Sequence, residues 1–515
     1  MSKEFQPLIT EREQHIIESE NPELLAAAED IAEIARDFGL DPFTTNFEIV
    51  PAKNVYEVAA YYIPGRFSHW TFGKAYYQEK TRYDYGLSKI YELVINTNPS
   101  IAYLLENNSD VQNKLVIAHV FGHTDFFKHN VAFADTNRKM HETAGLHADR
   151  IRKYEFEHGP EEVEKFLDAV LSIEHNIDRN YQREWSAVGY QEEMRQKFKE
   201  RQEAKKRRMS DYDDLFTSEK KSEAGLSPEK MPFPLEEEED ILGFIMTFSP
   251  KPLEDWQKDI CQIVRDEAYY FQPQGRTKIM NEGWAVFWHR KIGHELFERD
   301  KLTLGEAIEW DDLHSGIARP SAERVNPYHL GWQIWEDIDR KFKGIPHPEG
   351  KVEEDWQEIK KEPSFYEGRE DYDIFWVREN NPSDQAFLRS YLTKSLIDDH
   401  KLYTYGLHGN EWQKETYDPE VVRNQLIANL NYLPIIRVAE GGGDYKGNRE
   451  LYLRHAWDGL DLDASWADKT LQNVHGLWGR PVHLENMQGG DKMIFSCADG
   501  KIVEKRVLEK GVGKK

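Results

Sequence analysis

An apolar segment that begins near Ser109 and carries two histidines places the strongest constraint on how this chain can fold. Ser109, followed three residues later by Gln112, is a typical start of an α-helix. His119 and His123 lie one helical turn apart in this segment, so both side chains project from the same face of the helix. Because most of their neighbours are apolar, both rings are expected to be buried. A buried imidazole needs a polar partner, and the fold must bring one to this face.

The first candidate for that partner is Glu282, on a second predicted helix over residues 279–292. Two imidazoles and one carboxylate are a normal ligand set for a transition metal, and zinc comes first among the ions that suit it. His289 lies two turns beyond Glu282 on roughly the same face, as a fourth ligand or a proton carrier beside the ion. The alternatives are a hydrogen-bonded pair of core histidines and a glutamate that caps a helix or forms a buried salt bridge.

One residue that zinc peptidases use is absent from the two-histidine segment. In those enzymes the pair reads H-E-x-x-H, and the glutamate takes a proton from water at the metal. Val120 stands at that position here. The third ligand of such enzymes lies in an N-E-x-x-A sequence, which residues 281–285 (NEGWA) resemble. We therefore expect a zincin-like metal site without its usual base. The candidates for a replacement base are His289, Asp125 and Glu142, with His141, Glu174, His175 and Glu267 as further possibilities.

The pattern along the chain predicts a mainly α-helical body and a small α+β domain at the C-terminus. A length of 515 residues is typical of two or three domains, and 14 tryptophans argue against a disordered scaffold. Residues 1–20 are predicted to form a flexible arm and residues 21–425 the helical domain, with a charged insertion at about 196–235. Short strands, glycine-rich turns and a helix over 466–478 predict the α+β domain, residues 430–515.

Three local predictions are specific enough for a structure to test. Residues 22–39 have apolar positions at helical spacing and end in glycine, which predicts a helix with a glycine after its last turn. Residues 46–62 alternate more and favour a short strand. Residues 273–277 begin with proline and are predicted to form a loop between two helices.

Charge and cysteine content exclude several classes of protein. The net charge of −26 disfavours a non-specific grip on nucleic acid, which needs a clustered positive surface. The basic run at 197–208 is interpreted as an exposed charged helix, with a local nucleic-acid or partner contact as the alternative. Two cysteines exclude a disulfide framework and a cysteine zinc site. The chain has no apolar stretch long enough for a membrane span and no signal-peptide pattern, so a cytoplasmic protein is expected.

Several long stretches make the chain resemble the stage V sporulation protein R (SpoVR) family. The stretches that carry the resemblance are residues 66–74 (RFSHWTFGK), 91–108, 119–130 (HVFGHTDFFKHN), 256–271, 277–289 (TKIMNEGWAVFWH), 314–331 and 387–396. They cover most of residues 20–420, and residues 477–479 resemble the family's end region.

The resemblance implies a cytoplasmic bacterial or archaeal protein without an established reaction. In spore formers the family is tied to assembly of the spore cortex, a modified peptidoglycan. In other organisms it looks like part of a stress-response group, with a PrkA-type serine kinase and a von Willebrand-like domain protein as partners. His119, His123 and Glu282 fall in the family's own motif segments, which fits a shared site.

Two functions stay open on the sequence alone. In the first, the protein is a metal-dependent hydrolase of cell-wall or peptide metabolism, in which His119, His123 and Glu282 hold zinc and His289 assists. In the second, it is a non-catalytic partner or regulatory protein in a kinase-linked stress complex. The same side chains then form a structural metal site or a buried polar network.

Overall fold

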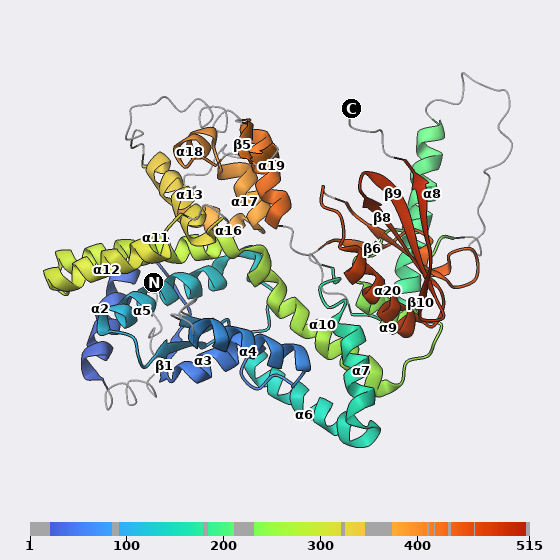
Figure 1. Cartoon of the computed structure of the whole chain (residues 1–515), viewed down its shortest axis with the longest axis horizontal. Coiled ribbons are helices and arrows are strands. Elements are labelled where there is room, and N and C mark those ends of the chain that lie inside the picture. Colours follow the sequence, from blue (N-terminus) through green and yellow to red (C-terminus); the bar gives the residue numbers. More distant parts are fainter. Residues whose placement is uncertain are drawn as a thin grey trace. The chain divides into compact units, whose positions relative to one another are not determined.

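The computed structural model describes residues 21–84, 92–178, 184–210, 231–320, 325–343, 345, 373–402, 404–408, 411–416, 418–430, 434–457 and 459–510. The predicted arm over 1–20 and residues 211–230 of the predicted insertion lie outside these ranges. The chain is mainly helical, as predicted, and carries a sheet near its C-terminus (Figure 1). Its contacts divide it into unit 1, Met1–Asp149 with Pro273–Leu430, and unit 2, Arg150–Gln272 with Asn431–Lys515.

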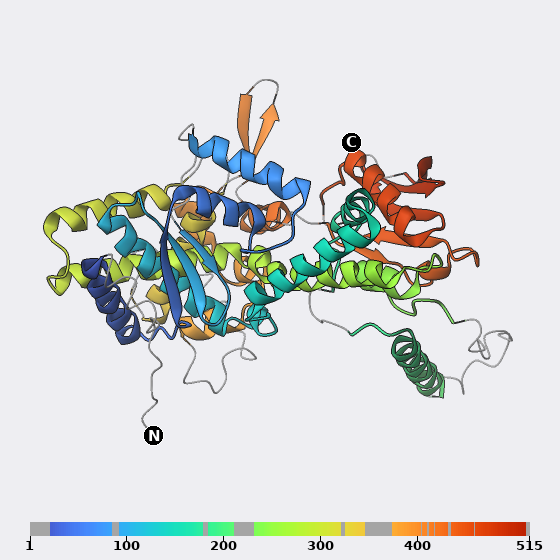
Figure 2. The same ribbon diagram turned by 90° about the horizontal axis from the view of Figure 1, so that it is seen from below.

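Unit 1 consists of helices around a small sheet. In that sheet β1 (Thr45–Val50) is parallel to β3 (Ser100–Leu105), and β3 is antiparallel to β2 (Glu92–Ile95). Strands β4 (Thr404–His408) and β5 (Glu411–Thr416) form a separate hairpin, drawn as orange arrows in Figure 2. The helices are α2 (Pro22–Asp37), α3 (Ala52–Tyr61), α4 (Trp70–Asp84), α5 (Asp110–His129), η1 (Val131–Phe133), α11 (Lys278–Glu298), α12 (Leu304–Ile317), α13 (Pro327–Phe342), α16 (Ile374–Asn380), α17 (Asp384–Tyr391), α18 (Lys394–Asp399) and α19 (Pro419–Leu430). Helix α6 (Met140–His158) begins in this unit.

Helix α11 packs unusually closely against two neighbours, because glycines line the contacts. A Cβ added at Gly122 of α5 would lie 2.7 Å from the Cα of Ala285 in α11. At Gly283 of α11, a Cβ would lie 2.3 Å from the backbone of Gly331 in α13. Real Cβ atoms do not approach other atoms this closely, so a larger side chain at either position would separate the helices. This close packing places side chains of α5 and of the N-terminal part of α11 near enough to contact one another.

Unit 2 is built on a five-stranded sheet with the strand order β10-β9-β8-β7-β6. Strands β7 and β8 are parallel, and the other neighbouring pairs are antiparallel. The strands are β6 (Ile436–Val438), β7 (Leu451–His455), β8 (Val482–Gln488), β9 (Asp491–Ala498) and β10 (Lys501–Glu509). The helices are α7 (Pro160–Leu171), α8 (Ala187–Ser210), α9 (Ile241–Phe248), α10 (Asp255–Arg276), which ends in unit 1, η4 (Gly442–Asp444) and α20 (Ala464–Trp478), which packs on the sheet.

This division differs from the predicted one, which separated residues 21–425 from 430–515. Residues 150–272 belong with the C-terminal residues, so the chain passes between the two units three times. Backbone hydrogen bonds join Glu238 to Val438 of β6, so the chain just after the predicted insertion extends the edge of the C-terminal sheet. The basic run lies on α8, where Lys197 and Arg201 pair with Glu236.

The local predictions had mixed outcomes. The first helix and its glycine are confirmed, since α2 is followed by Gly39 at φ 90°. The helix start at Ser109 is also confirmed, with reciprocal hydrogen bonds between Ser109 and Gln112. In residues 46–62 only the first part is a strand, and the rest forms α3.

The predicted loop over residues 273–277 is wrong, because α10 continues through Pro273 to Arg276. The hydroxyl of Thr277 donates to the carbonyl of Pro273 at 2.6 Å. This bond satisfies a helix-end carbonyl that would otherwise lack a partner within the helix. None of the helices in the described part of the chain is long and apolar enough to cross a membrane.

Candidate metal centre

His119, His123 and Glu282 meet where α5 packs against α11. The Nε2 of His123 lies 3.3 Å, and the Nε2 of His119 3.8 Å, from Oε2 of Glu282. Two ligands of a tetrahedral ion at bond lengths of 2.0–2.2 Å are about 3.4 Å apart, so these separations fit a shared ion. His119 and His123 are 2% and 5% exposed, whereas the Glu282 side chain is 16% exposed. The cluster is therefore buried on the histidine side and partly open on the glutamate side.

An outer hydrogen bond fixes the tautomer of His123. Its Nδ1 lies 2.9 Å from Oδ1 of Asn281, which only accepts, so Nδ1 carries the hydrogen and Nε2 presents a lone pair toward Glu282. An outer acceptor of this kind is usual for a metal-ligating histidine. Asn281 directly precedes Glu282, so one turn of α11 supplies both a candidate ligand and the group that orients another.

Two further histidines lie behind His119. Its Nδ1 is 2.9 Å from Nδ1 of His289, and Nε2 of His289 is 2.9 Å from Nδ1 of His314 on α12. Neutral rings allow two directions of donation along this row. Only the direction from His119 through His289 to His314 leaves a lone pair on Nε2 of His119, the atom that faces Glu282. In that direction the row would orient His119 for an ion as Asn281 orients His123.

The charges of the cluster suit a cation. Burial raises the pKa of Glu282, but hydrogen bonds from His119 and His123 lower it more when those rings carry a hydrogen on Nε2, so the net pKa is well below the usual value. Burial and the neighbouring His119 lower the pKa of His289 well below its usual range. Burial and the nearby Arg290 lower the pKa of His314 to about 4. At pH 7 the glutamate is ionised and both outer rings are neutral.

The structure places the other predicted site residues outside the ligand cluster. His289 is not a fourth member of it, because both of its ring nitrogens are hydrogen-bonded behind His119. Asp125 accepts hydrogen bonds from the Trp284 indole, the Arg378 guanidinium and the Asp41 amide, so its role is structural. Glu142 is exposed in the first turn of α6. Asp125 and Glu142 as replacement bases and His289 as a direct ligand therefore stay predictions, which these positions do not favour.

Sequence reasoning missed the orienting residues Asn281 and His314. Asn281 was visible inside the NEGWA segment, but nothing local showed that its side chain would reach His123. His314 lies on a separate helix, and only the packing of α12 against α11 brings it to His289. An aromatic neighbour, Tyr328 of α13, stacks on His119 with ring centroids 6.1 Å apart.

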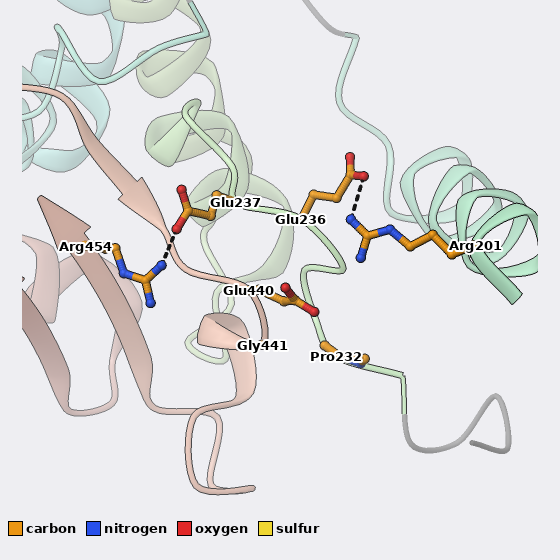
Figure 3. A pocket seen from close by; sticks show the side chains of 7 residues that line it. All are labelled: Arg201, Pro232, Glu236, Glu237, Glu440, Gly441 and Arg454. Carbon is orange, nitrogen blue, oxygen red and sulfur yellow. Dashed lines mark hydrogen bonds and ion pairs between the residues drawn. The ribbon is translucent and has the colours of Figure 1, made fainter. Parts of the chain in front are cut away.

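A separate pocket lies in unit 2 and is formed by ion pairs. Its volume is about 800 Å³, and Figure 3 shows the residues that line it: Arg201, Pro232, Glu236, Glu237, Glu440, Gly441 and Arg454. Arg201 pairs with Glu236 at 2.8 Å, and Arg454 pairs with Glu237. Each of these arginines already has a carboxylate partner. A ligand in this pocket would therefore meet ion pairs and not an isolated charge. The cluster in unit 1 remains the stronger candidate for chemistry.

The fold and the site together define a class of protein. It is mainly helical and has a buried cluster of two histidines and one carboxylate. Family comparisons agree with the resemblance noted in the sequence. The model described as SpoVR like protein matches residues 18–434, and the SpoVR-like C-terminal domain matches residues 434–489. The chain therefore belongs to the SpoVR family, which associates it with sporulation.

One relative spans nearly the whole chain. The uncharacterized protein YcgB of Escherichia coli (strain K12) is 30% identical over 509 residues, covering 91% of this chain and 93% of that protein. No solved structure matches the chain.

Proposed function

We propose that the protein is a metal-dependent hydrolase that holds a divalent ion, zinc first, between His119, His123 and Glu282. The observation that carries this proposal is the convergence of two Nε2 atoms and one carboxylate oxygen within 4.8 Å of one another. Three protein ligands with an open position are typical of catalytic zinc sites, whereas structural sites have four ligands and are closed. The partly exposed Glu282 provides the open side.

The proposed substrate class is a peptide or amide of cell-wall or peptide metabolism. A cell-wall substrate would agree with the family's link to sporulation. Zinc in such a site acts as a Lewis acid and lowers the pKa of bound water to about 7. This chemistry reduces the need for the glutamate that Val120 replaces. Asn281 and His289 would keep the two ligand rings in place. The likeness to a zincin rests on this chemistry and on the spacing of the three residues.

Metal analysis of the purified full-length protein tests the proposed ion. We expect about one zinc per chain in the wild type, much less in His123→Ala, and wild-type content in His129→Ala. His129 is a suitable control because it lies on the same helix but contacts Asp41 instead of the cluster. Wild-type protein without metal after zinc loading would remove the proposal. Thermal unfolding of each variant shows whether metal loss is separate from loss of the fold.

Hydrolysis is tested with a library of peptides and cell-wall amides. We expect zinc-dependent cleavage by the wild type and its loss in Glu282→Gln, which keeps the size of the side chain but removes its charge. Cleavage that persists in Glu282→Gln would contradict the proposed site.

The second candidate function is a non-catalytic role with a structural ion. Val120 in place of the base and the structural engagement of Asp125 favour it. In this case the protein would serve as a regulatory partner of a PrkA-type serine kinase and a von Willebrand-like domain protein in a stress complex. A chelator would then unfold unit 1, whereas a hydrolase would lose only activity.

A further inference from the structure

The sheet of unit 2 carries a second group of chemically active side chains. Helix α20 packs on the side of the sheet that holds Phe495, as the contacts of Lys505 with the Phe495 ring and with Asp468 show. Side chains alternate between the two faces of a strand. His483 of β8 and Ser496 of β9 therefore lie on the opposite face, where they are direct register partners.

Ser496, His483 and Glu450 form a continuous hydrogen-bonded series. Nδ1 of His483 lies 2.8 Å from Oγ of Ser496, and its Nε2 lies 2.9 Å from Oε2 of Glu450. A carboxylate only accepts, so Nε2 carries the hydrogen, and the lone pair on Nδ1 accepts the hydroxyl hydrogen of Ser496. A hydroxyl bonded to a base that a third group orients is the signature of an activated nucleophile.

The charge states of these groups suit a base. Burial lowers the pKa of His483, so the ring is neutral at pH 7. Burial raises the pKa of Glu450, but its bonds to His483 and Lys446 lower it more, so the carboxylate is ionised. Lys446 Nζ lies 3.2 Å from the same oxygen and helps to hold that charge.

The ring is turned relative to serine proteases, whose histidine directs Nε2 to serine and Nδ1 to the carboxylate. The chemistry needs only a lone pair facing the hydroxyl and a hydrogen held by the carboxylate, and both requirements are met here. Ser496 is 4% exposed, but it pairs with Glu504 of β10, a strand whose residues are almost all exposed. Glu504 is itself exposed, so this face of the sheet is open to solvent on the β10 side of Ser496.

We propose that Ser496 is a nucleophile activated by His483 and Glu450, and that it accepts acyl groups from small esters. Oγ of Ser496 bonds to the carbonyl carbon while its proton passes to Nδ1 of His483, and the alcohol leaves with that proton. Water then bonds to the acyl carbon, gives its proton to His483, and displaces Ser496, which regains its hydrogen as the acid departs. Water is the only co-reactant. The site lies within unit 2 and does not depend on the metal centre.

A fluorophosphonate probe on the full-length protein tests this proposal, with the labelled residue located by mass spectrometry. We expect label on Ser496, no label at that peptide in Ser496→Ala, and unchanged labelling in Ser465→Ala, which removes an exposed serine of α20. Since general-base catalysis typically contributes 10²–10⁴-fold, His483→Gln should label at least about 100-fold more slowly. Zinc chelation should leave the rate unchanged.

Three results would overturn the proposal: no label on folded wild-type protein, label that persists in Ser496→Ala, or wild-type labelling in His483→Gln. Should His483→Gln unfold, Glu450→Gln provides the second variant, since it keeps the size of the side chain and an acceptor for the ring. Slower labelling in folded Glu450→Gln supports the orienting carboxylate, and a wild-type rate contradicts it.

Discussion

At the scale of single residues, the groups behind the candidate ligands matter nearly as much as the ligands. We expect Asn281→Ala to weaken zinc binding about 10–100-fold, the usual effect of removing an outer partner of a ligand histidine. The reason is that Nδ1 of His123 would lose its acceptor and the ring its fixed orientation. Asn281→Asp keeps an acceptor and should bind zinc nearly as tightly as the wild type. Competition with a chromophoric chelator measures both affinities, and equal affinity in wild type and Asn281→Ala would contradict this role.

The outer histidines also predict how the stability of the metal-free protein depends on pH. His314 has a folded pKa of about 4 against an ordinary value of 6.5, so the unfolded chain binds more protons between these values. The free energy of unfolding therefore falls as the pH drops from about 6.5 to 4, by up to about 1.4 kcal/mol per pH unit for one such group.

Urea unfolding at pH 7 and pH 5 measures this change. We expect His314→Gln, which removes the titrating ring, to lose less stability on acidification than the wild type. The same loss in both proteins would show that His314 titrates normally in the folded state.

At the scale of helices, the glycine contacts set the geometry of the cluster. We expect Gly122→Ala to destabilise unit 1 by about 1–3 kcal/mol, the usual cost of overpacking, because its Cβ would meet the Ala285 backbone at 2.7 Å. Zinc affinity should fall with it, since the ligands come from both helices. Gly73→Ala on α4 is the matched control, because a Cβ there meets nothing within 4 Å. Denaturant unfolding checks both variants, and equal stabilities would contradict the close approach.

Local signals predicted some elements well and others poorly. The start of α5 was predictable because Ser109 and Gln112 bond to each other's backbone, which needs no tertiary contact. The helix that crosses Pro273 was not, because proline usually breaks a helix and no local signal shows that α10 continues to Arg276. The pairing of His119 with Glu282 was predictable from motif spacing, whereas His314 joins the site through helix packing alone.

At the scale of the whole molecule, the chain passes between the two units near residues 149, 272 and 430, and only the last of these points coincides with a change in composition. The change in composition near residue 430 correctly predicted a C-terminal sheet. It did not predict that residues 150–272 would belong to the same unit, because the Glu238–Val438 pairing depends on contacts far apart in sequence. The two candidate sites fall in different units, so each can be removed by substitution and tested while the other serves as an internal control.

The central claim is that His119, His123 and Glu282 share one metal ion. X-ray absorption at the zinc edge of the zinc-loaded full-length protein tests it most directly. We expect two imidazole nitrogens and at least one oxygen at about 2.0–2.2 Å, with the imidazole contribution reduced in His123→Ala. A zinc environment without imidazole, or one that His123→Ala leaves unchanged, would contradict the account.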